Sequence, residues 1–178
     1  MSLGKGYIQI YTGGGKGKTT AALGLALRAV GRGLIVYCVQ FLKSAPSGEV
    51  AAAERLAPQL RVFRFSSARD FFWRLDAEEK EEERGQSRAA LSFARAALQG
   101  RECDILILDE VLGALDNGLF SLEEILALLN DKPEGVEIIL TGRAAPPELL
   151  EKADLVTEMK EIRHYYRRGV PARNGIEK

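Results

Sequence analysis

The sequence has few of the residues on which many catalytic and metal sites depend. It contains two cysteines and one histidine in 178 residues: Cys38, Cys103 and His164. A structural zinc site takes about four cysteine or histidine ligands, and Cys–His or Ser–His catalysis needs a histidine beside its nucleophile. We therefore expect neither kind of site. Both cysteines lie in or beside apolar runs, which indicates small buried thiols in a reducing compartment.

Net charge and long apolar runs are also lacking. Lys plus Arg and Asp plus Glu both number 25, so the formal net charge is zero. We therefore expect no nucleic-acid partner, and any positive potential must be local. No apolar run approaches the ~20 residues that span a bilayer, and the chain does not open with a secretory pattern. A cytoplasmic protein with no membrane partner is expected.

Short β-rich runs alternate with longer helical patterns along most of the chain. This order predicts βαβ units and a parallel sheet with right-handed crossovers. In such sheets, ligands bind beyond the carboxyl ends of the strands. The expected strands are 7–11, 34–41, 61–65, 104–108, 136–140 and 155–159. The expected helices are 19–32, 49–57, 76–99, 121–130 and 147–153, followed by an irregular, basic segment over 163–178.

A glycine-rich loop follows the first expected strand and opens the first expected helix. Glycines let backbone N–H groups turn toward an anion, and the helix start adds positive potential. Lys18 would reach the terminal phosphates of ATP, and the Thr19 hydroxyl would bind Mg²⁺. The usual pattern has glycine where this chain has Thr12, so the match is a variant. The predicted ATP-binding residues of the loop are Gly13, Gly14, Gly15, Lys16, Gly17, Lys18, Thr19 and Thr20.

With the alternating strands and helices, this loop predicts the fold class. We expect residues 1–178 to form a single α/β domain of the P-loop NTPase-like type. It would have three layers around a mostly parallel central sheet, in the manner of RecA-like proteins. A glycine-rich turn with no ligand is the alternative, and the order of strand, loop, Gly-Lys-Thr and helix argues against it.

Two other strand ends carry candidate site residues. Strand 104–108 ends in Asp109 and Glu110, a Walker B pattern whose carboxylates can hold Mg²⁺, or Mn²⁺ in its place. A buried strand with a solvated acidic end is the alternative. Strand 136–140 leads into Thr141-Gly142-Arg143, where the planar fork of Arg143 suits phosphate oxygens. An ordinary turn explains that tripeptide equally well.

Three consecutive aromatic residues, Phe71, Phe72 and Trp73, stand in an expected loop. They form either a small satellite core or the wall of a site for a flat ligand. Spacing alone favours the satellite core. The acidic run 78–83 that follows is expected to be a solvated helix face, with its acids at the helix start where the dipole favours them.

Taken in order, these motifs resemble the ATP:corrinoid adenosyltransferases, the family that includes the cob(I)yrinic acid a,c-diamide adenosyltransferases. The resemblance covers nearly the whole chain, and it is specific in the order and spacing of its blocks. Many members have Asn where this chain has Gly14. The blocks are 12–22, Val-Gln-Phe-Leu-Lys at 39–43, Gly48-Glu49, Phe71-x-Trp73, Asp109-Glu110, Thr141-Gly142-Arg143 and a pattern from His164 to Glu177.

The resemblance implies an activity and roles for the candidate residues. The family transfers the 5′-deoxyadenosyl group of ATP to the Co(I) centre of a corrinoid, such as cobalamin or cobyrinic acid a,c-diamide, and releases triphosphate. Its P-loop holds the triphosphate in the reverse sense. Lys18 and Arg143 would then act catalytically on the phosphates. Phe71 and Trp73 would act on the lower corrinoid face, and Gln40 would also contact the corrinoid.

The resemblance also implies partners, and two other functions stay open. Besides ATP and a reduced corrinoid, we expect an electron-donating reductase or flavoprotein, and a homodimer is compatible with the pattern. The enzymatic alternative is an ordinary P-loop ATPase or phosphotransferase, against which the C-terminal pattern and Phe71-x-Trp73 argue. The non-enzymatic alternative is an ATP-gated corrinoid-binding module.

Overall fold

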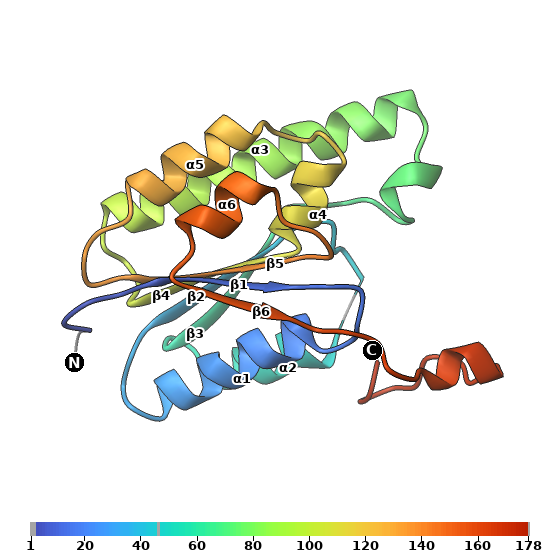
Figure 1. Ribbon diagram of the computed structural model, residues 1–178, viewed down its shortest axis with the longest axis horizontal. Helices are drawn as coiled ribbons and strands as arrows, with labels where there is room; N and C mark the ends of the chain where they lie inside the picture. Colours follow the sequence, from blue (N-terminus) through green and yellow to red (C-terminus); the bar gives the residue numbers. More distant parts are fainter. Residues whose placement is uncertain (1–2, 46, 178) are drawn as a thin grey trace.

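A parallel sheet forms the middle layer of the fold (Figure 1). The computed structural model describes residues 3–45 and 47–177. In this part of the chain the sheet has six strands in the order β3-β2-β4-β5-β1-β6, and all neighbouring strands are parallel. The strands are β1 (Ile8–Thr12), β2 (Val36–Gln40), β3 (Leu60–Arg64), β4 (Ile105–Asp109), β5 (Glu137–Thr141) and β6 (Leu155–Glu158).

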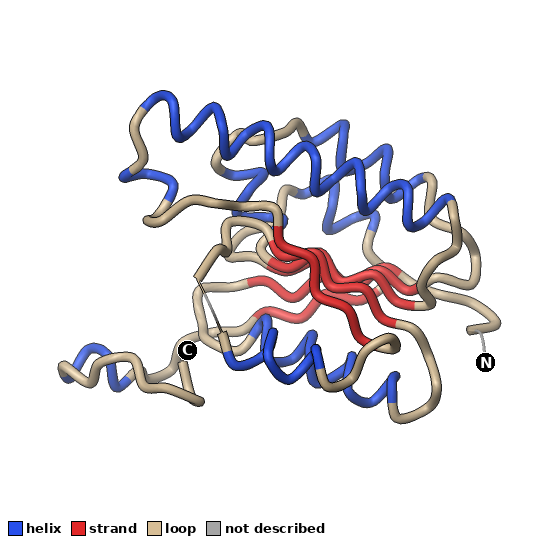
Figure 2. Tube along the Cα trace, turned by 180° about the vertical axis from the view of Figure 1, so that it is seen from behind, coloured by secondary structure: helices blue, strands red, loops and turns tan. Residues whose placement is uncertain are grey.

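Helices cover both faces of this sheet, so the fold has three layers (Figures 1 and 2). One face carries α1 (Lys18–Val30) and α2 (Gly48–Glu54). The other carries α3 (Ala77–Gln99), α4 (Val111–Asp116), α5 (Leu122–Asn130) and α6 (Pro147–Lys152). The prediction of a three-layer α/β domain of the P-loop type with a mostly parallel sheet is confirmed.

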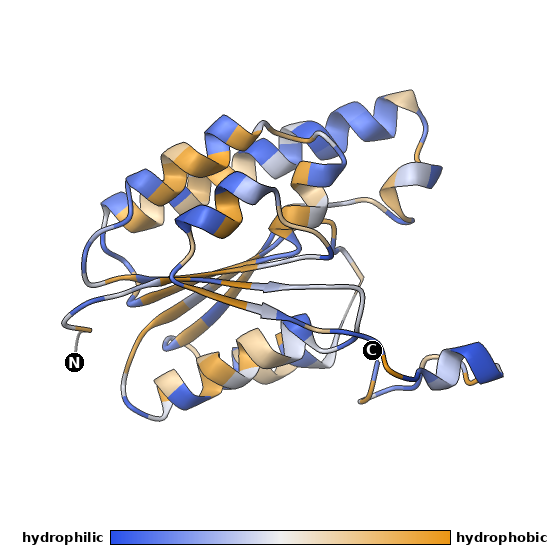
Figure 3. Cartoon of the chain, in the orientation of Figure 1, coloured by the Kyte–Doolittle hydropathy of each residue, from blue (hydrophilic) through white to orange (hydrophobic). Residues whose placement is uncertain are grey.

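The core lies on both sides of the sheet, as the strand sequences require. Every residue of β4 is buried, because a strand covered on both faces has no solvent side. Its side chains alternate between the two apolar clusters: Leu106 and Leu108 pack toward α3 and α5, and Ile105 and Ile107 pack with Ala22 of α1. Figure 3 shows the apolar residues gathered between the layers.

Local sequence signals account for most helix boundaries. Ser121 caps α5 by accepting from the backbone N–H of Glu124, the predicted capping box, and Asp76 with Glu79 caps α3 in the same way. α4 was not among the expected helices. It follows directly on Glu110, whose φ of 61° is left-handed. The sequence therefore has no Ser, Thr, Asp or Asn at the N-cap that would predict this helix.

Two expected surface features differ in detail. Within the acidic run 78–83, Glu83 is buried and its Oε2 accepts a hydrogen bond from the Ser66 hydroxyl at 2.6 Å. The expectation of a fully solvated face is therefore wrong at this one position, where the run meets the loop after β3. The segment expected to be irregular contains a short 3₁₀ turn, Tyr165–Arg168, and extends away from the sheet beyond β6 (Figure 1).

The strand order decides which residues meet at the carboxyl edge of the sheet. β5 lies between β1, which leads into the glycine-rich loop, and β4, which ends in Asp109. Pairing of β2 with β3 and with β4 sets Gln40 level with Arg64 on one side and Asp109 on the other. No helix in the described part of the chain is long and apolar enough to cross a membrane.

Burial of the cysteines gives a testable consequence. Cys38 is 0% exposed and Cys103 5% exposed. Burial raises the pKa of the Cys38 thiol well above its usual value, and it raises the pKa of Cys103 to about 12. At pH 8 both thiols are therefore protonated as well as covered. We expect iodoacetamide to modify neither in the native protein and both in guanidinium, as counted by mass spectrometry. Rapid alkylation of either cysteine in the native protein would contradict this placement.

Candidate active site

The glycine-rich loop between β1 and α1 curls around its own lysine. Gly17 takes a left-handed φ of 113° at the start of α1, a conformation that favours glycine. The Lys18 Nζ turns back and donates to the carbonyls of Gly13 at 2.7 Å and Gly15 at 2.9 Å. Burial lowers the pKa of Lys18, while the nearby carboxylate of Glu110 raises it. A cation thus lies inside the loop at the start of the helix.

Two neighbouring segments hold this loop in place. A Cβ atom added at Gly15 would lie 2.7 Å from the Met159 carbonyl oxygen, and the Gly15 N–H donates to that oxygen at 2.7 Å. Thr12, at the variant position, donates its hydroxyl to the Arg143 carbonyl at 3.2 Å. At Gly14 an added Cβ would meet nothing within 4 Å. A Cβ atom is therefore accommodated at this position without a clash.

A buried carboxylate lies directly across from the loop. Asp109 is 0% exposed, and its Oδ1 accepts from the hydroxyls of Thr19 at 2.8 Å and Thr141 at 2.7 Å. Its Oδ2 accepts from Gln40 Nε2 at 3.0 Å and Lys43 Nζ at 2.6 Å. Because β5 lies between β1 and β4, Thr141 at its end also reaches Asp109. Four donors compensate the cost of burying the charge.

The position of Gln40 does not match the contact that the sequence suggested. Gln40 is 0% exposed, donates to Asp109 and accepts from Arg64 Nε at 2.7 Å. It lies on β2, a covered strand between β3 and β4, so both polar atoms of its amide are hydrogen-bonded to residues of the neighbouring strands. We correct the expectation: Gln40 orients Asp109 and has no surface that a corrinoid could contact in this structure.

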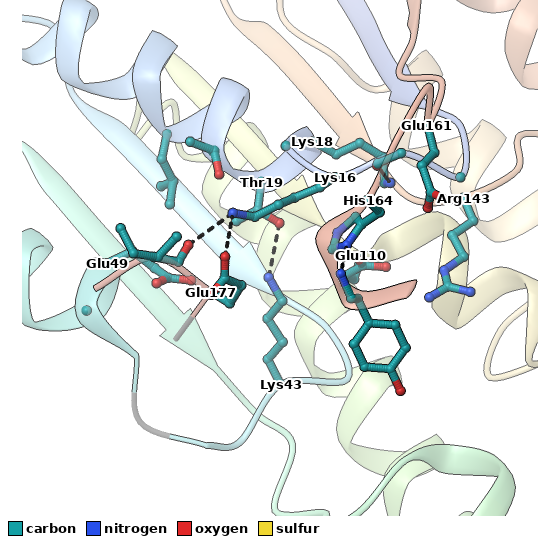
Figure 4. A pocket seen from close by; sticks show the side chains of 18 of the residues that line it. Lys16, Lys18, Thr19, Lys43, Glu49, Glu110, Arg143, Glu161, His164 and Glu177 are labelled. Carbon is teal, nitrogen blue, oxygen red and sulfur yellow. Dashed lines mark hydrogen bonds and ion pairs between the residues drawn. The ribbon is translucent and has the colours of Figure 1, made fainter. Parts of the chain in front are cut away.

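Most of the remaining predicted residues lie around one pocket of about 1060 Å³ (Figure 4). The glycine-rich loop from Gly14 to Thr20 lines it together with Glu110 and Arg143. Gly13 is buried, and neither Gly13 nor Asp109 lines this pocket. The backbone N–H of Glu110 donates to the Thr141 hydroxyl at 2.8 Å, and Glu110 itself lines the pocket. The structure places these residues around one pocket. That they bind phosphate stays a prediction.

Sequence reasoning missed two parts of this pocket. Lys43 follows β2 and donates to Thr19 Oγ1 at 3.1 Å as well as to Asp109. Its place just past a strand end was the signal that could have marked it. The second part is the C-terminal segment, where Lys16 Nζ donates to the Ile176 carbonyl at 3.2 Å. The lining residues from this segment are Glu161, His164, Tyr166, Arg167, Gly175, Ile176 and Glu177.

A second pocket of about 570 Å³ adjoins the first and contains the three aromatic residues. Phe71 is 59% exposed and Trp73 65% exposed. Their rings are stacked, with centroids 4.6 Å apart and planes 6° apart. Phe72 instead packs against the main core. The satellite-core interpretation is therefore wrong for Phe71 and Trp73 and right for Phe72, because residues around the 3₁₀ turn Phe72–Arg74 face different sides.

Comparison with known proteins gives the family. Residues 4–177 match the model of the ATP:corrinoid adenosyltransferase BtuR/CobO/CobP family. The chain belongs to this family. A corrinoid adenosyltransferase of Escherichia coli (strain K12) is 36% identical over 174 residues, covering 97% of this chain and 86% of that protein. The corrinoid adenosyltransferase CobA of Salmonella typhimurium (strain LT2) is 34% identical over 174 residues, with the same coverages of 97% and 86%.

A more distant relative extends the same similarity. A corrinoid adenosyltransferase of Pseudomonas aeruginosa is 32% identical over 174 residues, covering 97% of this chain and 84% of that protein. The match to the family model reaches from before β1 to Glu177. The C-terminal segment that lines the pocket at the glycine-rich loop therefore lies within the residues matched by the family model.

The glycine-rich loop supports a matched pair of substitutions. Gly15→Ala places a methyl group against the Met159 carbonyl, so the loop must shift, whereas Gly14→Ala points into open space. We expect Gly15→Ala to weaken ATP binding at least about tenfold, because small displacements of binding groups are costly. Gly14→Ala should stay within about twofold of the unmodified protein by calorimetry. Equal effects of the two substitutions would contradict the loop geometry.

Proposed function

We propose that this protein transfers the 5′-deoxyadenosyl group of ATP to the Co(I) centre of a corrinoid and releases triphosphate. The observation that carries the proposal is the junction of the two pockets. The pocket at the glycine-rich loop and the aromatic pocket share Lys43, Glu49 and Glu177 as lining residues. A nucleotide held by its phosphates in the first pocket can therefore present C5′ toward a flat ligand in the second.

The inventory of reactive side chains suits this reaction. Co(I) is itself the nucleophile, so the cobalt–C5′ bond forms while the C5′–oxygen bond breaks and its electron pair leaves with triphosphate. The protein then supplies binding, orientation and charge. Both cysteines are buried away from the pocket, and the reaction needs no protein nucleophile. Lys16, Lys18 and Arg143 are the cations that would stabilise the charge on the departing triphosphate.

A divalent cation fits the site as part of this proposal. The Thr19 hydroxyl and the Asp109 carboxylate are hydrogen-bonded at 2.8 Å, and both are oxygen donors of the kind that Mg²⁺ prefers. Among the described residues no group of three or more His, Cys, Asp or Glu side chains could hold a metal ion. Mg²⁺ would therefore be held by Thr19 with Asp109 or Glu110, and it would supply charge neutralisation for the phosphates bound beside it.

The stacked rings of Phe71 and Trp73 are the proposed contact for the corrin face. Their exposure leaves a flat apolar surface free for a flat ligand, which aromatic side chains bind well. Contact with the lower face would displace the axial ligand of cobalt(II), and four-coordinate cobalt is easier to reduce to Co(I). A reductase or flavoprotein would deliver that electron. The homodimer and the cytoplasmic location expected from the sequence stay predictions.

Product analysis tests the proposal against the ATPase alternative. With ATP, Mg²⁺ and cob(I)alamin in the dark, we expect stoichiometric triphosphate and light-sensitive adenosylcobalamin, separated by chromatography. The physical reason is that attack on C5′ leaves all three phosphates joined. Formation of ADP at the same rate with and without corrinoid would replace the proposal with ordinary phosphate hydrolysis. Binding of both ligands without any product would favour the ATP-gated binding module.

The aromatic pair gives a second test with an internal control. We expect Phe71→Ala and Trp73→Ala to slow adenosylation that starts from cobalt(II) about tenfold more than adenosylation from chemically supplied Co(I), the effect of losing one aromatic contact. Phe72→Ala, which removes a ring that packs on the core, should instead lower Tm by roughly 5 °C. If all three substitutions lower Tm and both reactions alike, the rings serve packing and not the corrinoid.

A further inference from the structure

Lys43 occupies the place between the two groups proposed to hold the divalent cation. Its Nζ lies 2.6 Å from Asp109 Oδ2 and 3.1 Å from Thr19 Oγ1 (Figure 4 shows the contact with Thr19). These oxygens come from β4 and α1, and the two residues that carry them are 90 positions apart in the chain. An ammonium group with two such contacts takes the position that a metal ion would take between the same oxygens.

The backbone just before Lys43 has an unusual conformation that directs the chain at this turn. Leu42, immediately before Lys43, has a φ of 56°, a left-handed conformation that a non-glycine residue adopts only when its surroundings hold it there. The Leu42 side chain packs against the main core, and this contact anchors the turn. The Lys43 side chain is 28% exposed while Asp109 is 0% exposed, so the ammonium closes a buried carboxylate from the solvent side.

An ammonium ion and a divalent cation cannot share these oxygens. At a separation of about 3–4 Å their repulsion exceeds thermal energy several-fold, even with the effective dielectric constant of a protein surface. We propose that Lys43 is a built-in counter-ion that holds the metal position in the nucleotide-free protein and must be displaced before a divalent cation binds. Asp109 is then never left as an uncompensated buried charge.

Displacement of Lys43 couples the metal to the nucleotide. Lys43 lines both the pocket at the glycine-rich loop and the aromatic pocket. Rotation of its side chain would therefore bring the ammonium to a bound triphosphate. Metal alone offers it no such partner, whereas the metal–nucleotide complex brings phosphate oxygens and a net negative charge to the same pocket. The protein therefore admits the divalent cation together with ATP and excludes the free ion. This inference rests on the metal position proposed above but not on adenosyl transfer.

Metal binding without nucleotide tests the inference directly. We expect Lys43→Met to bind Mn²⁺ alone at least about tenfold more tightly than the unmodified protein, because the competing charge is gone. The Mn²⁺ affinity is measured by electron paramagnetic resonance in the absence of ATP and corrinoid. Lys16→Met is the matched control, since it removes the same charge from the same pocket without contact to Asp109. It should change the Mn²⁺ affinity much less.

Stability supplies a second readout. In EDTA, Lys43→Met should lower Tm by roughly 5 °C or more, because Asp109 loses its cation. Saturating Mn²⁺ should restore Tm in this variant and leave the unmodified protein nearly unchanged. The double variant Lys43→Met with Asp109→Asn removes both charges, so it should be more stable in EDTA than Lys43→Met alone and should not respond to Mn²⁺.

Three outcomes would overturn the inference. The first is an Mn²⁺ affinity that Lys43→Met leaves unchanged. The second is an equal gain in Lys16→Met, which would show a general charge effect. The third concerns the case in which Lys43→Met does not fold. If the double variant Lys43→Met with Asp109→Asn then also fails to fold, compensation of the Asp109 charge is not the role of Lys43. None of these measurements involves a corrinoid, so they can fail while adenosyl transfer itself is established.

Discussion

The buried carboxylate of Asp109 is the group on which the arrangement of this site depends. It ends the central strand β4, and its four hydrogen-bond donors come from the glycine-rich loop helix, from β5, from β2 and from the turn after β2. An unpaired carboxylate at that depth would cost several kcal/mol, so the elements that supply the donors are held in register with one another. Two of these donors, Thr19 and Lys43, also line the pocket at the glycine-rich loop.

A chain with zero net charge thereby gathers many charged side chains in one place. One pocket is lined by five cations, Lys16, Lys18, Lys43, Arg143 and Arg167, and by four carboxylates, Glu49, Glu110, Glu161 and Glu177. This concentration follows from topology, because the carboxyl ends of parallel strands meet at one edge of the sheet. The aromatic pocket beside it adds the exposed rings of Phe71 and Trp73 to several charged side chains. One edge of the sheet thus offers adjoining surfaces for an anion and for a flat apolar molecule.

Much of this arrangement was predictable where the signal is local. The alternation of apolar runs and helical patterns gave the layers, and the spacing of glycines with Lys18 and Thr19 marked the loop. The predictions failed where a contact between distant segments decides the outcome. Gln40 was expected at a ligand but lies buried between Arg64 and Asp109, since the order of β3, β2 and β4 cannot be read from any one strand.

The sequence by itself determined the element types, the glycine-rich loop and the family resemblance, because these depend on neighbouring residues and their periodicity. Only the tertiary structure decided which side chains meet. Strand order set β5 between β1 and β4, so that Thr141 meets Asp109. It also brought Lys43 of the turn after β2 to the carboxylate that ends β4. Such pairings depend on long-range packing, which has no signature in the spacing of residues along the chain.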